Sequence, residues 1–251
     1  MRHIPRDQNC RALREAGPAP ATMVRMPSLT DQRLSPTDVD GLGEAGEPVE
    51  LLRCDLSELR VRDADLDDVT FTDCTLDGAD LTGSRLSGAA FTGGSATNLR
   101  LDRCDLTDAR FDRVDLSGAV LSGALLTDAE FRGCRMTGLV AEATRGMGCL
   151  LLGCNAYGAE LPGLVLARRA HTGSRFTEAN LAGADLREAV LDGCVLLHTD
   201  LSGANLDGAD LRGADLGPCT RERLDILSGA ILTTAQAVAA LQDLTGAVVT
   251  D

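Results

Sequence analysis

Cysteine is the residue type in this sequence best suited to metal or disulfide chemistry, and there are nine of them. No pair has the CxxC spacing of a zinc site, so we predict no metal site. Only Cys10 lies outside a five-residue repeat. The other eight occupy the same small position of that repeat: Cys54, Cys74, Cys104, Cys134, Cys149, Cys154, Cys194 and Cys219. We therefore interpret them as small buried side chains.

Acid–base catalysis would need one of three histidines or a carboxylate with a shifted pKa. His3 lies outside the repeat, His171 takes a position that is otherwise apolar, and His198 falls at an outward corner. The carboxylates fall at outward positions, where no cleft would desolvate them. No nucleophile–base pair or phosphate-binding glycine loop can be assembled from these residues. We therefore predict that the chain is not an enzyme, has no catalytic residues and binds no cofactor.

A period of five residues organises the chain from Leu51 to Leu216, as in Ala79–Gly83 (ADLTG). The central residue is Leu, Phe, Met or Val, and the residue two places earlier is usually small. The central position departs from this rule at Ala96, Ala141, Gly146, Ala156 and His171. Residues two apart in an extended chain point to the same side, so we expect both to face inward. Glycine two places after the centre favours a turn.

The phenylalanines indicate how many repeats make one coil. All five lie at central positions, and a spacing of twenty separates Phe71, Phe91, Phe111 and Phe131. Four repeats therefore make one coil, and the four rings should stack along one inner wall. At a strand spacing of about 4.8 Å, the array predicts a rod of roughly 40 Å.

The A(D/N)LxG pattern resembles the pentapeptide-repeat family over residues 49–218. With the two periods, it predicts an all-β fold, a right-handed quadrilateral parallel β-helix with a short C-terminal helical cap. We expect a β-helix over residues 48–220 and a cap or dimerisation segment over 221–251. The prolines and scattered charges of residues 1–47 predict a flexible extension, with a partner-binding arm as the alternative.

The sequence has neither an apolar run long enough to span a membrane nor a secretory h-region, so we expect a cytoplasmic protein that does not bind membranes. Cys54 with Cys74, and Cys134 with Cys154, would stack on adjacent coils at a Cα distance that does not exclude a disulfide. A reducing cytosol disfavours one.

The C-terminal segment predicts a helix. After Leu216, Ile226 and Ile231 suggest two further repeats, and Thr233 or Thr234 can cap a helix over 235–241 that ends before Gly246. Six apolar residues would form its contact surface: Leu232, Ala235, Val238, Leu241, Val248 and Val249. This segment could cap the coil alone, or also join two rods as a homodimer through residues 224–250, as the family resemblance implies.

Between residues 139 and 173 the pattern weakens, because Gly146, Ala156 and His171 take central positions and Arg169 takes an inward one. The register resumes at Phe176, so this stretch is either a loosened coil or a loop whose length is a multiple of five. Neutral drift and a specific contact surface are both open interpretations.

The formal charge of −14 argues against a nucleic-acid-binding protein and favours a basic partner. One side of the coil gathers six aspartates against Arg85: Asp65, Asp67, Asp68, Asp105, Asp108 and Asp128. Neighbouring corners add four: Asp63, Asp73, Asp77 and Asp80.

This acidic rod resembles the Qnr and MfpA type of pentapeptide-repeat protein. The resemblance implies DNA mimicry at a bacterial type II topoisomerase, DNA gyrase or topoisomerase IV, and resistance or self-immunity to gyrase poisons. The alternative is a generic interaction scaffold or regulatory protein with no topoisomerase target.

Overall fold

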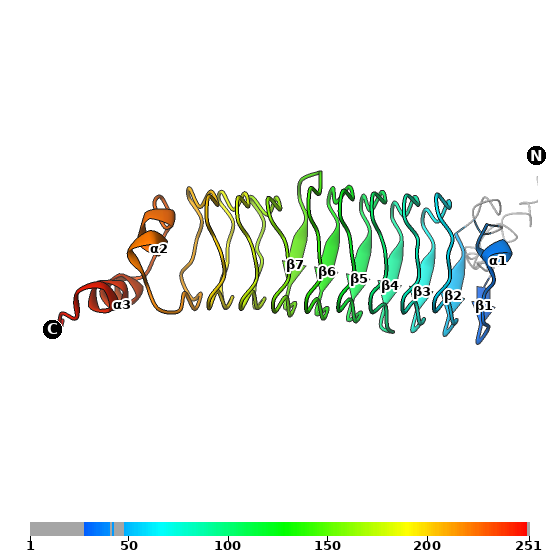
Figure 1. Ribbon diagram of the computed structural model, residues 1–251, viewed down its shortest axis with the longest axis horizontal. Coiled ribbons are helices and arrows are strands. Elements are labelled where there is room, and N and C mark those ends of the chain that lie inside the picture. The colour runs from blue at the N-terminus through cyan, green and yellow to red at the C-terminus, as the bar shows by residue number, and fades with distance from the viewer. Residues whose placement is uncertain (1–27, 41, 43–47, 250–251) are drawn as a thin grey trace, which may run out of the picture.

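The computed structural model describes residues 28–40, 42 and 48–249. It shows a rod of stacked coils, with the chain entering at one end and two helices at the other (Figure 1). The predicted parallel β-solenoid with a helical C-terminus is confirmed.

One side of the solenoid is a seven-stranded parallel sheet in the order β1-β2-β3-β4-β5-β6-β7. From β2 onward each strand pairs with the one twenty residues later, for example Leu51 with Phe71. The strands are β1 (Ser28–Thr30), β2 (Glu50–Leu52), β3 (Thr70–Thr72), β4 (Ala90–Thr92), β5 (Arg110–Asp112), β6 (Glu130–Arg132) and β7 (Leu150–Leu152).

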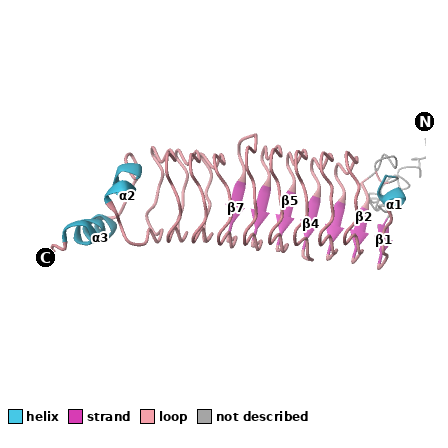
Figure 2. Ribbon diagram, viewed as in Figure 1, coloured by secondary structure: helices cyan, strands magenta, loops and turns pink. Residues whose placement is uncertain are grey.

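The other three sides are joined by single parallel bridges, which is why strands are drawn along one side only (Figure 2). Three series of bridges include Asp55–Thr75, Arg60–Asp80 and Asp65–Arg85 and advance in steps of twenty residues, the third with a gap after Arg145. With the sheet they make four pairing ladders per coil. The solenoid is therefore four-sided, as the coincidence of the two periods predicts.

The phenylalanine stack is also confirmed. Ring centroids of Phe71 and Phe91 are 4.5 Å apart, those of Phe91 and Phe111 4.6 Å, and those of Phe111 and Phe131 4.8 Å. The planes of Phe111 and Phe131 differ by 6°, and all four rings are buried. The rings repeat at the strand spacing because each is carried by a paired strand.

At the corners, the residue two places after each centre takes a left-handed backbone conformation. Gly88 has φ +68° and Asp68, one coil earlier, has φ +58°. A Cβ on Gly88 would collide with the Asp68 carboxylate, which lies over the glycine. Glycine thus supplies both the turn and the space that the aspartate side chain of the adjacent coil occupies.

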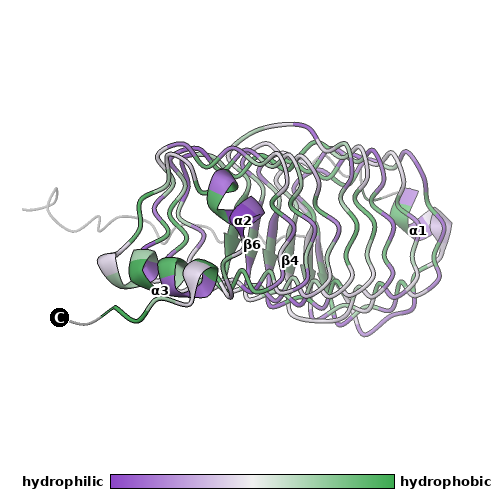
Figure 3. Ribbon diagram, turned by 60° about the vertical axis from the view of Figure 1, so that its left-hand side comes forward, coloured by the Kyte–Doolittle hydropathy of each residue, from purple (hydrophilic) through white to green (hydrophobic). Residues whose placement is uncertain are grey.

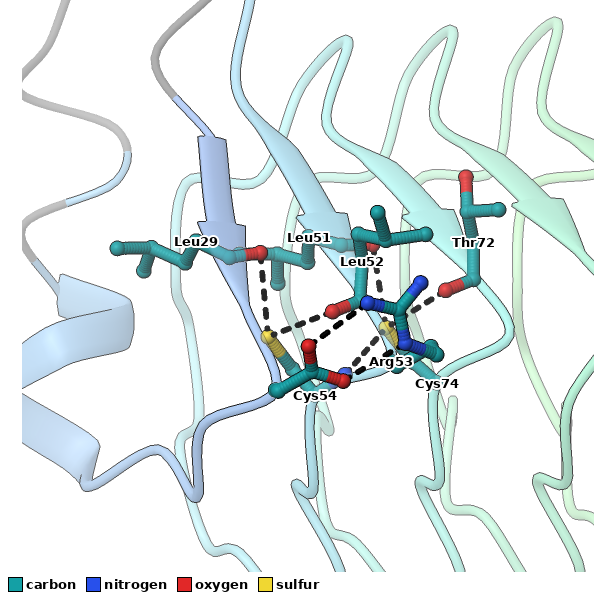
Figure 4. Close-up of polar contacts among 8 residues, drawn as sticks. Leu29, Leu51, Leu52, Arg53, Cys54, Thr72 and Cys74 are labelled. Atoms are coloured by element: carbon teal, nitrogen blue, oxygen red, sulfur yellow. Dashed lines mark hydrogen bonds and ion pairs between the residues drawn. The ribbon is translucent and has the colours of Figure 1, made fainter.

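The solenoid begins earlier than the continuous repeat. β1 pairs with β2, with Leu29 opposite Leu51 (Figure 4). The Asp31 carboxylate binds the Arg53 guanidinium at 2.7 Å. Residues 28–34, which the sequence pattern assigns to the flexible extension, thus form part of an additional coil. A helix, α1 (Pro36–Asp40), follows them. Residues 1–27 of that extension lie outside the described residues.

The inward thiols bond adjacent coils together. The Cys74 thiol donates to the Leu51 carbonyl at 3.2 Å, and the Cys54 thiol donates to the Leu29 carbonyl at 3.4 Å (Figure 4). These cysteines are free and buried, and burial raises the pKa of Cys74 to about 11. A thiol of this kind is a structural hydrogen-bond donor rather than a nucleophile.

The irregular stretch is a loosened coil without an inserted loop. Bridges join Leu125 to Arg145 and Val165 to Asp185, but among the described residues no bridge joins Arg145 to Val165. The imidazole of His171 bonds this region to its neighbours. Leu151 N donates to Nδ1 at 3.2 Å, and Nε2 donates to the Leu166 carbonyl at 2.7 Å.

The C-terminal segment forms α2 (Arg221–Ile226) and α3 (Thr234–Thr245) at the end of the rod (Figure 3). The expected repeat centred on Ile226 is wrong, because that residue ends α2. Ile231 does pair with the rod, bridging Asp210. The predicted helix cap is confirmed: Thr233 forms a capping box with Gln236, and Gly246 ends the helix with φ +65°.

Candidate interaction surface

The six predicted aspartates lie on one side of the solenoid, which we call the acidic wall. Its ladder runs from Asp65 through Arg85, Asp105 and Leu125 to Arg145. Paired neighbours on a ladder stack at the coil spacing of about 4.8 Å. The structure therefore brings the aspartates together along one line of the rod.

Three of these aspartates are engaged in hydrogen bonds within the solenoid. Asp67 accepts a hydrogen bond from Ser87 N of the next coil at 2.9 Å. Asp105 accepts from Thr107 N at 3.0 Å and from the Thr107 hydroxyl at 2.7 Å. Asp65 accepts from Arg85 at 3.1 Å. Replacing Asp67 or Asp105 would remove a bond that shapes the backbone, so these positions are unsuited to a test of surface charge.

The other three aspartates occupy corner positions with a left-handed backbone and are exposed. Within the described part of the chain, Asp68 and Asp108 make no hydrogen bond or ion pair through their carboxylates. Asp128 lies 3.5 Å from the guanidinium of Arg169. The free charge of the acidic wall thus resides at its corner.

Arginines limit the length of the acidic stretch. Arg85 pairs with Asp67 at 2.6 Å. Beyond Asp128 the same side of the solenoid is close to neutral, since Arg187 pairs with Asp185 at 2.7 Å and Arg168 pairs with Glu188 at 3.2 Å. The acidic wall therefore occupies the N-terminal half of the rod.

The aspartates of the neighbouring corners likewise include both exposed carboxylates and carboxylates that are paired within the solenoid. Asp63 and Asp73 are exposed corner residues with left-handed backbones. Burial alone would raise the pKa of Asp80, but hydrogen bonds from Thr82 and Arg62 outweigh it and lower that pKa to about 2. Asp80 is therefore a buried, paired carboxylate and offers nothing to a partner.

The end of the rod is closed by polar side chains that sequence patterning missed. Arg223 of α2 donates to the carbonyls of Leu196 at 2.6 Å and Thr199 at 3.3 Å. Gln236 of α3 donates to the carbonyls of Leu211 at 2.8 Å and Ala214 at 2.9 Å. Among the described residues, the carbonyls of Thr199 and Ala214 lack the backbone donor that a further coil would supply, and these side chains provide one.

The predicted apolar contact residues point mostly away from the rod. Ala235 is exposed, and the exposed fraction is 49% for Leu241 and 85% for Val248. Only Ala240 of α3 is buried. A half-open cavity of about 220 Å³, lined largely by apolar residues, separates α3 from the last coil. An apolar surface is therefore left uncovered at this end.

In the part of the chain that the structure describes, no three His, Cys, Asp or Glu side chains are grouped so as to hold a metal ion. No helix among the described residues is long and apolar enough to cross a membrane.

Comparison with known proteins identifies the repeat. A model of the pentapeptide repeat region matches residues 47–121, and a model of eight pentapeptide repeats matches residues 179–217. Comparison with curated protein sequences found no significant match. The matched segments lie at the two ends of the array and share its register. Both ends of the array therefore consist of pentapeptide repeats.

One solved structure gives the same fold, and a second is similar to part of the chain. A trypsin-treated form of QnrB1, a plasmid-mediated fluoroquinolone resistance protein, matches with a TM-score of 0.54 and 21% identity, over 90% of this chain and 98% of that one. HetL, involved in heterocyst differentiation regulation in the cyanobacterium Nostoc sp. strain PCC 7120, matches with a TM-score of 0.44 and 26% identity, over 82% and 86% of the two chains. The likeness to QnrB1 concerns the fold.

Proposed function

We propose that this protein mimics DNA, binds DNA gyrase or topoisomerase IV through the acidic wall, and protects the enzyme from gyrase poisons. The observation that carries the proposal is the line of exposed carboxylates on one side of a rod. A basic DNA-binding channel is the kind of protein surface that such a line would complement.

The charge density supports the comparison with DNA. Between the coils of Leu66 and Leu126 the wall spans about 14 Å, from three steps of about 4.8 Å. Six aspartates, less the charges of Arg85 and Arg169, leave about one negative charge per 3.5 Å. One strand of duplex DNA carries one charge per about 3.4 Å of helix axis.

The fold is consistent with this role. A protein described as conferring plasmid-mediated fluoroquinolone resistance has the same solenoid architecture. Fold alone does not specify a partner, so the proposal depends on the wall.

A matched pair of variants tests the wall. Asp68→Asn with Asp108→Asn removes its two free charges. The control, Asp63→Asn with Asp73→Asn, removes two charges from corners of the same left-handed geometry on other sides of the rod. Asparagine tolerates that backbone conformation, so both proteins should fold. We expect the wild type and the control to lower poison-induced DNA cleavage by gyrase at similar concentrations, and the wall variant to need several-fold more protein.

Each outcome has a distinct meaning. Equal protection by both variants would retain the partner and reject the acidic wall as the contact. Unchanged cleavage at a large excess of wild-type protein would reject the topoisomerase target and leave a scaffold role with another partner.

A further inference from the structure

Met147 is the most exposed large apolar side chain on the coils. Its exposed fraction is 70%, whereas Tyr157 reaches 43% and Val190 36%. Gly146 and Gly148 flank it, with φ +100° and +79°. Just before β7, one corner of the rod projects beyond its neighbours (Figure 1). The backbone here presents a single methionine to the outside.

The backbone around Met147 departs from the regular coil. Gly146 occupies the central position that Leu126 and Leu166 fill in adjacent coils. A Cβ at Gly146 would lie 2.6 Å from Thr127 N, so a larger residue does not fit. The described chain also lacks the bridge from residue 150 to residue 170 that the pattern predicts. Backbone irregularity of this kind is typical of functional positions.

Arg169 stabilises the irregular corner. It takes an inward position that is small in other coils, such as Ala129 and Ala189. Its guanidinium lies 3.5 Å from Asp128 and 3.8 Å from Glu130. Because these carboxylates belong to a coil two turns earlier, the arginine side chain spans the coil that carries Met147. The ion pairs bridge the place where backbone pairing is missing.

The position of Met147 relates it to the acidic wall. It lies on the same side of the solenoid, one coil beyond Asp128 and two beyond Asp108. A thioether side chain is flexible and fills irregular apolar sockets. Interfaces commonly combine such a buried apolar anchor with charged contacts around it.

We propose that Met147 is an apolar anchor that inserts into a socket beside the basic surface contacted by the acidic wall. This inference rests on the proposed function and adds to it a contact that charge does not supply. Apolar burial is insensitive to the salt screening that weakens exposed ion pairs. Measurement of binding at two salt concentrations therefore separates the apolar contact of Met147 from the charge contacts of the acidic wall.

The test measures the Kd for gyrase of four proteins at about 50 and about 200 mM salt. Met147→Ser should weaken binding about tenfold at both concentrations, as expected for the loss of one partly buried side chain. Met147→Leu should remain close to wild type. Tyr157→Ser, which removes a large exposed side chain on the opposite side of the coil, is the matched control and should also remain close to wild type.

The results separate the anchor from the proposed function. If Met147→Ser binds gyrase as tightly as the wild type and has the same Tm, the anchor is overturned and the target is retained. An effect of Met147→Ser that Tyr157→Ser reproduces would also overturn it. Absence of wild-type binding would overturn the proposed function, and the anchor with it.

Discussion

Replacement of Phe111 by alanine is the perturbation that tests the solenoid core most severely. The ring is buried, and its centroid lies 4.6 Å from that of Phe91 and 4.8 Å from that of Phe131. Alanine at this position removes one of the two inner members of the four-ring stack. Since the neighbouring backbone is held by strand pairing on both sides, the cavity cannot readily collapse.

Two contributions determine how much Phe111→Ala lowers the free energy of unfolding. Truncating a buried phenylalanine to alanine typically costs about 3 to 5 kcal/mol of unfolding free energy. The two ring–ring contacts, each worth about 0.5 to 1.5 kcal/mol, favour the upper part of that range. Phe111→Leu, which restores the commonest central residue of the repeat, should cost about 1 to 3 kcal/mol because it loses mainly the stacking.

Urea denaturation followed by far-UV circular dichroism measures these differences. Thr92→Ala is the control, because Thr92 faces outward beside Phe91 in β4 and should cost less than about 1 kcal/mol. Repeat proteins can unfold in parts, so coincident transitions from a second probe should accompany each curve. A cost for Phe111→Ala no larger than that for Thr92→Ala would refute the stacked core.

Three further predictions concern the irregular coil and the C-terminus. Burial, aided by the charge of Arg169 and opposed by the bond to the Leu166 carbonyl, lowers the pKa of His171. The unfolded chain therefore takes up the proton first as pH falls through about 6.5, and stability decreases below that pH. Urea midpoints at two pH values should show that His171→Leu lacks this decrease, and an identical decrease in the variant would exclude His171 as its source. Gln236→Leu should cost about 1 to 3 kcal/mol locally by leaving the Ala214 carbonyl unpaired, whereas the Leu211 carbonyl still accepts from Ala214 N. Hydrogen exchange of α3 amides should then accelerate, whereas equal protection would show that the cap is held otherwise. We propose a homodimer through the exposed C-terminal apolar residues, so light scattering should report a dimer for the wild type and a monomer for Leu241→Ser, and a monomeric wild type would contradict this proposal.

The solenoid could be predicted because its determinants are local and repeated. A central apolar residue every five positions defines the sides, and phenylalanine every twenty defines the coil. The coil that includes residues 28–34 could not be predicted in this way, because its register differs from that of the main array. Leu29 and Leu34 keep the spacing of five but are offset by two residues from the register that starts at Leu51. A repeat pattern that is followed in a single register does not include a coil that an irregular connection shifts by two residues.

The side of the rod on which each carboxylate lies could also be predicted, but whether the carboxylate is free to contact a partner could not. Asp105 and Asp108 both fall at outward positions of the repeat, yet the first bonds Thr107 and the second is exposed at a left-handed corner. That difference depends on the direction of the side chain at the turn. The cap illustrates the same limit, because the amide of Gln236 finds its carbonyl partners only once α3 lies across the end of the rod.

Competition with DNA tests the central claim most directly. Labelled duplex DNA bound to gyrase is titrated with the wild-type protein, and its release is followed by fluorescence anisotropy at about 50 and about 200 mM salt. We expect the protein to displace the DNA, less effectively at the higher salt, with Asp68→Asn/Asp108→Asn weaker than Asp63→Asn/Asp73→Asn. Full retention of DNA on gyrase at saturating concentrations of the protein would contradict DNA mimicry.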